Sequence, residues 1–230
     1  MENITDVSVI SLTESRYLHP MRLSYKQAGS PRLWDLMRCH DSVAIVIFNT
    51  ETKKFIFVQQ FRPAVYLSQV APAVTVGDQV DTDKFPGHLG LTVELCAGIV
   101  DKELSLEEIA RQEVREECGY LLPHGRLTKI VTFPSSVGSS GEEALISRQN
   151  CPPSVGGTQT LFCAEVVSSD RVGEGGGLEE EGEMIRVVEM SVEEVQVLLT
   201  SDTVNSPAGL LYGVNWYLQN RLGRLLSAQQ

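Results

Sequence analysis

The chain has 230 residues and a formal net charge of −11 at pH 7. Hydrophobic residues make up 42% of it, an ordinary share for a globular protein, and the length is enough for one large domain or for one domain with an accessory piece. The excess of acids argues against binding to a nucleic-acid backbone, which needs a basic face. It leaves a phosphate substrate open, because bound metals can reverse the local sign of the charge.

The five cysteines form no recognisable metal or disulfide pattern. Their number is odd and no two are spaced as C-x-x-C, so zinc and a disulfide framework are both poor interpretations, and a reducing compartment is favoured. The first residues lack the basic and apolar regions of a secretory signal, and no run of about 18 apolar residues predicts a transmembrane helix. We therefore expect a cytoplasmic protein that does not bind membranes.

Apolar periodicity divides the chain into strands and helices. Up to residue 133 we expect a loop at 67–90 and strands at 6–12, 21–27, 42–48, 54–60, 91–97 and 126–133. In the C-terminal half we expect an acidic, Gly-rich loop at 168–183, strands at 161–167 and 184–190, and helices at 192–200 and 207–226. Neither a repeat nor a domain linker is visible, so one α/β domain with a mixed sheet between helices is the economical architecture.

The clearest predicted element is a helix across 106–118. Ser105 is a good N-cap, and Glu108, three residues later, completes an S-x-x-E capping box. Gly119 suits the left-handed position just beyond the helix C-terminus. Ser191 and Glu194 form a second capping box, which predicts the start of the helix at 192–200.

Three acids crowd the last two turns of this helix. Glu113 and Glu117 lie roughly 40° apart around its axis, on the side that carries apolar residues, and Glu116 lies at the edge of that side. Mutual repulsion, the helix dipole and partial burial all disfavour such an arrangement. A hard divalent cation such as Mg²⁺ removes these costs. The alternative is a solvated charged helix whose acids pair with Arg111 and Arg115.

The surrounding residues resemble the Nudix box, G-x5-E-x7-R-E-U-x-E-E-x-G-U, where U is a bulky apolar residue. The matching positions are Gly98, Glu113, Val114, Glu116, Glu117, Gly119 and Tyr120. Two positions depart from the motif, because Leu104 replaces its first Glu and Gln112 replaces its Arg. In the family these two positions support the metal-binding acids, so the departures put the orientation of the ligands in doubt and not the ligands themselves.

The resemblance extends over most of residues 17–226 and includes "HDSVAIVIFN", "FVQQFRPAVY" and "VELCAGIVD". These segments resemble the ADP-ribose and UDP-sugar pyrophosphatase branch of the Nudix superfamily. The resemblance implies a Nudix fold over 38–226, with a mixed β-sheet sandwiched between helices. It also implies an N-terminal β extension at 1–37 that helps to build a homodimer.

The same resemblance implies roles for several acids. The implied ligands of Mg²⁺, or of Mn²⁺ in its place, are Glu113, Glu116, Glu117 and the backbone carbonyl of Ala97. The general base is expected from the acidic loop, where Glu181 and Glu183 match best by position, and Glu116 is also expected to contribute to catalysis. The alternative for the acidic run is a solvated charge cluster.

Four further residues are candidate substrate contacts. Arg62 is the expected phosphate ligand, since Arg binds phosphate through two nitrogen atoms, with a surface salt bridge as the alternative. Glu94 is expected to point into the same cleft, where it orients the substrate or a ligand, or pairs with Arg62. Trp34 and Tyr66 are candidates for stacking on the base, with core packing as the alternative for each.

Residues 134–160 are rich in Ser, Gly and Pro, and "PSSVGS" is echoed by "PPSVGGT". Three interpretations remain open: a surface insertion, a lid near the substrate, and an aberrant splice product that damages the fold.

The function implied by the resemblance is Mg²⁺-dependent hydrolysis of nucleoside diphosphate sugars, with UDP-glucose giving UMP and glucose 1-phosphate. ADP-ribose is the rival main substrate. A catalytically weak Nudix module that binds nucleotides as a sensor or scaffold is the alternative from another class, and it is motivated by Leu104, Gln112 and the segment 134–160.

Overall fold

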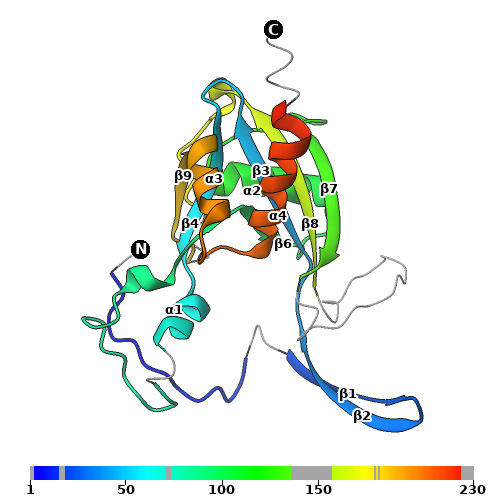
Figure 1. The fold of residues 1–230 in the computed structure, drawn as a ribbon, viewed down its shortest axis with the longest axis vertical. Helices are drawn as coiled ribbons and strands as arrows, with labels where there is room; N and C mark the ends of the chain where they lie inside the picture. Colours follow the sequence, from blue (N-terminus) through cyan, green and yellow to red (C-terminus); the bar gives the residue numbers. More distant parts are fainter. Residues whose placement is uncertain are drawn as a thin grey trace.

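The computed structural model describes residues 3–15, 19–70, 74–135, 157–178, 180 and 182–223. A seven-stranded sheet lies between helices, as Figure 1 shows. Its path runs β5–β4–β3–β8–β7, with β6 also paired to β3 and β9 to β4. The strands are β3 (Ser42–Asn49), β4 (Lys54–Phe61), β5 (Leu91–Glu94), β6 (Cys96–Ile99), β7 (Leu127–Pro134), β8 (Thr158–Val166) and β9 (Ile185–Ser191). The pair β3–β8 is parallel, whereas the other strand pairs of this sheet are antiparallel. The predicted mixed sheet is therefore confirmed.

Helices cover both faces of this sheet (Figure 1). Helix α2 (Leu106–Cys118) packs on one face, and α3 (Val192–Thr200) and α4 (Ala208–Tyr217) pack on the other. Helix α4 continues into a π-helical turn at Leu218–Leu222. Among the described helices, none has the length and apolar character needed to cross a membrane.

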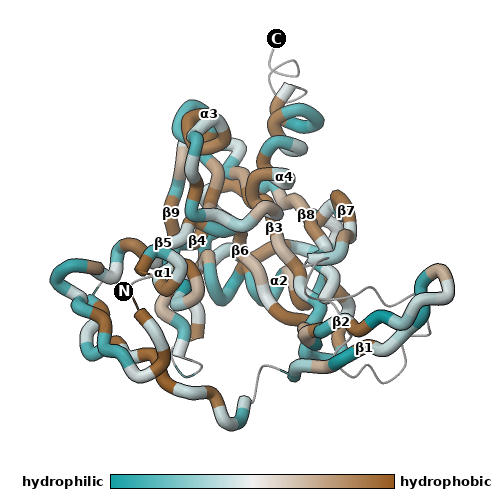
Figure 2. The backbone as a smooth tube through the Cα atoms, turned by 60° about the horizontal axis from the view of Figure 1, so that its bottom comes forward, coloured by the Kyte–Doolittle hydropathy of each residue, from teal (hydrophilic) through white to brown (hydrophobic). Residues whose placement is uncertain are grey.

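Strand β3 is buried on both faces, which explains its uninterrupted apolar sequence. Val43, Ile45 and Ile47 pack in the cluster beneath α2, and the alternate residues Ala44, Val46 and Phe48 pack in the cluster beneath α3 and α4. Figure 2 shows the resulting hydrophobic colouring at the centre of the molecule. The two hydrophobic cores therefore lie on either side of one central strand.

The N-terminal part forms a separate two-stranded sheet, β1 (His19–Gln27) with β2 (Ser30–Arg38). This hairpin projects away from the main sheet and carries hydrophobic residues among hydrophilic ones (Figures 1 and 2). The expected strand at 21–27 is confirmed within β1. The expected strand at 6–12 is wrong, because that described segment forms no strand: it has the isolated bridge Ser8–Gln79 and backbone hydrogen bonds of Val7 and Val9 with residues 77–80.

The segment between β4 and α2 departs from expectation in two places. The predicted loop 67–90 begins inside a short helix, α1 (Pro63–Val70), and ends in a 3₁₀ turn, η1 (Gly87–Gly90). The predicted strand 91–97 is two strands that separate at Leu95, because β5 pairs with β4 whereas β6 pairs with β3. The change of partner places β6 directly beside the central strand.

Strands β7 and β8 form a hairpin whose two strands meet at Ser135 and Gly157. The Ser135 backbone N–H and hydroxyl donate to the Gly157 carbonyl over 2.9 and 2.6 Å. Residues 158–160, which the sequence placed in the Ser/Gly/Pro-rich segment, belong to β8. The three interpretations of that segment concern residues 136–156, which lie outside the described residues.

The predicted helix 106–118 is confirmed as α2. Ser105 Oγ accepts the Glu108 N–H over 3.1 Å, and Gly119 has the left-handed φ of 75°. The return bond of this capping box is replaced, because the Glu108 carboxylate binds Arg111 over 3.0 Å. At α3 the second predicted box is complete in both directions.

Candidate active site

Glu113 and Glu117 point from α2 toward the sheet, beneath β6. Glu117 is only 3% exposed and accepts the Ala97 backbone N–H over 2.9 Å. A Cβ atom at Gly98 would overlap the Glu113 carboxylate, so glycine at this position lets Glu113 lie directly against the strand. The helical phase expected for the two acids is therefore the phase that the structure shows.

The pKa values of both acids, the buried Glu117 and the partly buried Glu113, are raised. Burial raises the pKa of Glu117 to about 8, although the hydrogen bond from the Ala97 N–H acts to lower it. Burial, followed by repulsion from Glu116 and Glu183, raises the pKa of Glu113 to about 7. Such acids ionise fully at neutral pH only when positive charge is supplied nearby.

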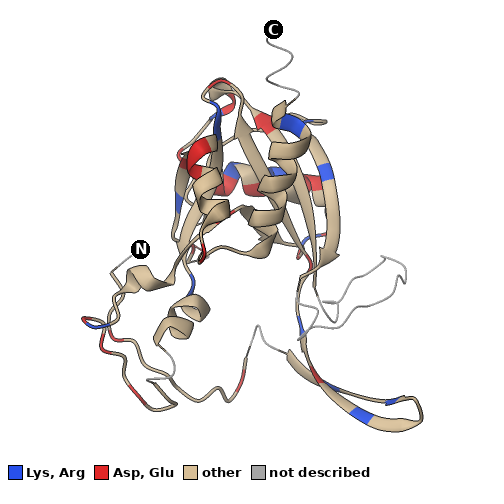
Figure 3. Cartoon of the chain, viewed as in Figure 1, with Lys and Arg blue, Asp and Glu red and all other residues tan. Residues whose placement is uncertain are grey.

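The neighbouring arginines do not supply that charge. The Arg111 guanidinium pairs with Glu108 and donates to the Leu122 carbonyl over 2.7 Å. In the part of the chain that the structure describes, no ion pair involves the acids at 113, 116 or 117. Figure 3 shows both acidic and basic residues on α2, behind the strands of the sheet. The interpretation of α2 as a helix of mutually neutralised surface charges therefore does not describe these three acids.

A Gly-rich loop closes the C-terminal end of α2. The Gly176 N–H donates to the Glu117 carbonyl over 2.9 Å, and the Gly177 N–H donates to the Glu116 carbonyl over 3.1 Å. These bonds satisfy carbonyls that a helix end leaves without intrahelical partners. A Cβ atom at Gly175 would overlap the Glu117 carbonyl, so the close approach depends on glycine.

The same loop positions Glu183. Its carboxylate accepts the Leu178 N–H over 2.8 Å, and a Cβ atom at Gly177 would lie 2.5 Å from its Oε2. The charge of Glu183 contributes to the raised pKa values of Glu113 and Glu117, which places it in their electrostatic reach. Glu181, the other candidate base, lies outside the described residues.

Arg62 and Glu94 form a two-bond ion pair, with distances of 2.7 and 2.6 Å. Glu94 is buried and also accepts hydrogen bonds from Thr92 over 2.6 Å and Gln60 over 3.3 Å. Burial acts to raise the pKa of Glu94, but these bonds outweigh it and lower the pKa. The guanidinium remains half-exposed, so it is held firmly and still faces solvent.

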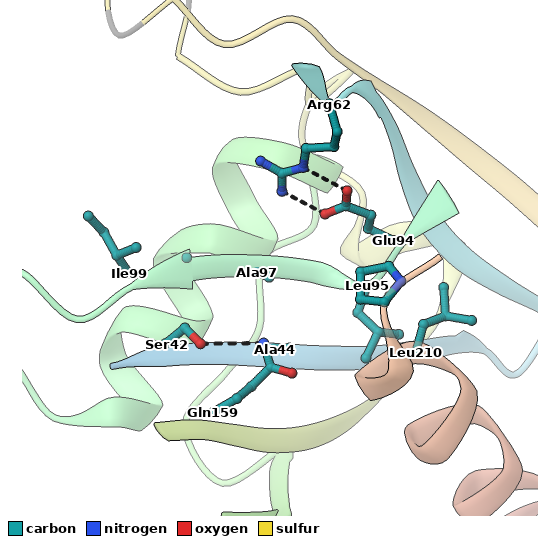
Figure 4. A pocket seen from close by; sticks show the side chains of 11 residues that line it. Ser42, Ala44, Arg62, Glu94, Leu95, Ala97, Ile99, Gln159 and Leu210 are labelled. Carbon is teal, nitrogen blue, oxygen red and sulfur yellow. Dashed lines mark hydrogen bonds and ion pairs between the residues drawn. The ribbon is translucent and has the colours of Figure 1, made fainter. Parts of the chain in front are cut away.

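A cavity of about 250 Å³ opens beside this pair (Figure 4). It is lined by Ser42, Ala44, Arg62, Glu94, Leu95, Ala97, Gly98, Ile99, Gln159, Pro207 and Leu210. Two of these residues, Ala97 and Gly98, also contact Glu117 and Glu113. Strand β6 therefore separates the acids, on the α2 side, from the cavity, on the α4 side.

The two aromatic candidates lie elsewhere. Tyr66 is 2% exposed, donates its hydroxyl to the Phe85 carbonyl over 2.5 Å and packs on Phe61. The core-packing alternative is therefore what the structure shows for Tyr66. Trp34 is 52% exposed, lies opposite Leu23 on the projecting hairpin and does not line the cavity.

Sequence reasoning missed Ser42 and Gln159. Both line the cavity, and each is a polar residue that precedes the apolar run of its strand. That break in the pattern was the available signal, but the pairing of β3 with β8 was needed to bring the two residues together.

The acids suit a hard divalent cation. Carboxylate and carbonyl oxygens are its preferred ligands, and Mg²⁺ typically uses one or two carboxylates together with water and substrate phosphates. Within the described ranges, no three His, Cys, Asp or Glu side chains form a ready ligand set. A bound cation would accordingly complete its shell with backbone, water or substrate oxygens.

Comparison with known proteins gives the family. The chain is 38% identical to the mouse uridine diphosphate glucose pyrophosphatase NUDT14, over 94% of this chain and 95% of that protein. The chain belongs to the Nudix hydrolase family. The bovine protein of the same name is 37% identical over the same shares of both chains.

More distant proteins resemble this Nudix hydrolase as well. A GDP-mannose pyrophosphatase of Cronobacter sakazakii is 29% identical over 67% of this chain and 61% of its own. A crystal structure of an ADP compounds hydrolase has the same fold, with a TM-score of 0.56, 16% identity and 95% coverage of both chains. No family model matches the sequence.

Proposed function

We propose that this Nudix hydrolase cleaves the pyrophosphate bond of nucleoside diphosphate sugars, with UDP-glucose as the main substrate and UMP and glucose 1-phosphate as products. The observation that carries the proposal is the 38% identity to a uridine diphosphate glucose pyrophosphatase over nearly the full length of both chains. The acids of α2 and the charge of Arg62, on which Glu117 and Glu183 act, support it, because such groups suit a reaction at a phosphate group.

The proposed cofactor is Mg²⁺, with Mn²⁺ able to replace it. The residues that would hold it are Glu113, Glu116, Glu117 and the carbonyl of Ala97. When bound, such an ion neutralises charge on the phosphate oxygens and makes water more acidic. The hydrogen bond from the Ala97 N–H already orients one of these carboxylates, that of Glu117.

The protein's own groups have distinct tasks in this proposal. Arg62 binds phosphate oxygens through its guanidinium N–H groups that face solvent, and Glu94 fixes the plane of the guanidinium. Glu183 accepts a proton from the water whose oxygen attacks phosphorus, while the bond from that phosphorus to the bridging oxygen breaks. Glu181 is the alternative base, and separate Gln substitutions at 181 and 183 distinguish the two.

We further propose a homodimer built through the N-terminal extension at 1–37, with 38–226 as the catalytic unit. The support is apolar surface on the hairpin, where Leu23, Leu33 and Trp34 are at least half exposed. Trp34 contacts substrate in this proposal only across the dimer, because it is remote from the cavity of its own chain. A cytoplasmic location is proposed as well, supported by the free thiols of the four cysteines that the structure describes.

The test is hydrolysis of UDP-glucose and ADP-ribose in parallel, with Mg²⁺ and with EDTA. Turnover of UDP-glucose should require the cation and fall by at least about 100-fold in Glu117→Gln, since a buried ligand is lost. Glu107→Gln is the matched control, because Glu107 is an exposed acid on the same helix.

Faster turnover of ADP-ribose than of UDP-glucose would reassign the main substrate. Absence of turnover with either compound, from protein with an intact unfolding transition, would support a nucleotide-binding module. Leu104 and Gln112 would then be restored to Glu and Arg to ask whether the motif departures are the cause.

A further inference from the structure

The cavity has a polar floor that the proposed phosphate chemistry does not use. Ser42 on β3 and Gln159 on β8 lie opposite each other in the parallel pair, and Gln159 Nε2 donates to Ser42 Oγ over 3.3 Å (Figure 4). Arg62 and Glu94 lie at another part of the same lining. A molecule in the cavity therefore meets an ionic group in one place and uncharged hydrogen-bonding groups in another.

The Gln159 amide is held in place by the start of α4. A Cβ atom at Gly209 would overlap Gln159 Oε1, so this helix approaches the amide as closely as glycine allows. Among the described residues, the bond to Ser42 is the only hydrogen bond of either side chain. The Ser42 O–H and the second Gln159 N–H thus remain available to a ligand.

The rest of the lining indicates which part of a substrate fits. Ala44, Leu95, Pro207 and Leu210 are apolar, and none of the lining residues is aromatic. Proteins commonly hold bases by stacking them on aromatic side chains, which this lining does not offer. A volume of about 250 Å³ is also below the roughly 300–1,000 Å³ typical of sites that enclose a whole drug-sized ligand.

We propose that this cavity binds the sugar half of the nucleotide sugar, and that Ser42 and Gln159 recognise its hydroxyl groups. The inference rests on the proposed function and deepens it by naming the specificity-determining residues. The phosphate attached to the sugar lies toward Arg62, and the base lies outside the cavity. Gly209 is a positioning residue that acts through Gln159.

The experiment compares wild type, Ser42→Ala, Gln159→Leu and the control Thr160→Val. Thr160 is the neighbour of Gln159 on β8, but its hydroxyl bonds Thr132 over 2.9 Å and does not line the cavity. Binding of glucose 1-phosphate and of UMP is measured by calorimetry with Mg²⁺, and kcat/KM is measured for UDP-glucose, UDP-galactose and ADP-glucose.

The two cavity variants should weaken glucose 1-phosphate binding by roughly tenfold, the usual effect of one lost hydrogen bond, and leave UMP binding unchanged. They should also change the preference between UDP-glucose and UDP-galactose, which differ in the configuration of one hydroxyl group, and keep the preference between UDP-glucose and ADP-glucose. Gly209→Ala should shift the same quantities in the same direction.

Weaker UMP binding, or a changed preference between the uracil and adenine substrates, would place the base in the cavity and overturn the proposal. Unchanged glucose 1-phosphate binding in both variants would overturn it as well. Ser42→Ala removes a single oxygen atom and carries the test if Gln159→Leu does not fold. Failure of wild type to hydrolyse any of the three nucleotide sugars would instead refute the proposed function.

Discussion

Glu117 lies where its charge is hardest to sustain. The Ala97 backbone N–H and the Cys96 thiol hydrogen-bond a carboxylate that is almost completely buried, and the charges of Glu113 and Glu183 raise its pKa. Ionisation of Glu117 is therefore unfavourable in the folded chain unless positive charge is supplied nearby. Two measurable consequences follow, one without metal and one with it.

Without metal, the free energy of unfolding should fall as pH rises. An acid whose pKa is raised in the folded state contributes stability that is complete below its unfolded pKa of about 4.3 and lost as pH rises through its folded pKa. For Glu117 the folded pKa is about 8. Urea unfolding in EDTA is measured at pH values of about 5.5, 7 and 8.5. The free energy of unfolding of Glu117→Gln should rise relative to that of wild type by on the order of 3 kcal/mol across this range. Parallel pH profiles for the two proteins would contradict this.

With Mg²⁺ present, the stabilisation that the ion provides should increase as pH rises. Protons and cations compete for the same carboxylates, so Mg²⁺ should raise the unfolding temperature more at a pH of about 8.5 than at about 6. The expected rise disappears in Glu117→Gln and persists in the exposed-acid control Glu107→Gln. Thermal unfolding followed by dye fluorescence at several Mg²⁺ concentrations measures it. An equal rise in both variants would show that the ion binds elsewhere.

At the residue scale, helix periodicity correctly predicted that Glu113 and Glu117 face the sheet. The phase of Glu113 and Glu117 follows from helix geometry alone, and the ion pair of Arg62 with Glu94 was one of the anticipated arrangements. Ser42 and Gln159 could not be paired in the same way, because they are 117 residues apart and meet only through the β3–β8 register.

At the scale of elements, the junction between α2 and the Gly-rich loop is the part most sensitive to side-chain size. Gly119 has φ 75°, and a Cβ atom there would overlap the Gly173 carbonyl. The Gly173 and Val172 N–H groups both donate to the Gly119 carbonyl, so the loop and the helix end are fastened at one residue.

Gly119→Ala should therefore destabilise the fold more than a positive φ alone explains. Gly125→Ala is the matched control, because Gly125 has φ 83° and a Cβ atom there would meet no other atom within 4 Å. Gly125→Ala should lower the free energy of unfolding by about 1–2 kcal/mol, and Gly119→Ala should lower it by clearly more. Urea denaturation compares them, and equal losses would show that the loop contact contributes little.

Periodicity located most helices and strands but could not choose their partners. The central strands β3 and β4 and helices α2 and α3 were predicted within about one residue because each carries a strong apolar pattern or a cap. The continuous pattern of 91–97 conceals the change of partner at Leu95, and the alternation in 6–12 has no strand to pair with beyond one bridge among the described residues.

At the scale of the whole molecule, the projecting hairpin exposes apolar side chains that no described part of the same chain covers. Leu23 and Trp34 form a cross-strand pair with half of each side chain exposed. Apolar surface of this kind is typical of an interaction site.

The proposed homodimer should consequently depend on this pair. Leu23→Glu combined with Trp34→Glu should convert the wild-type dimer to monomer in light scattering coupled to size-exclusion chromatography. Lys26→Glu is the control, since it changes charge on the same hairpin without adding charge to the apolar pair. A monomeric wild type, or a double variant that stays dimeric, would contradict a dimer through the hairpin.

The hydrogen bonds between Ser135 and Gly157 bear on which insertions and deletions the sequence can tolerate. They hold Ser135 and Gly157 side by side at the end of the paired strands β7 and β8. The entropy of closing such a connection grows only slowly with its length. Insertions and deletions between these two residues should therefore cost the β7–β8 pairing little free energy, and a peptide tag placed there should leave the unfolding temperature almost unchanged.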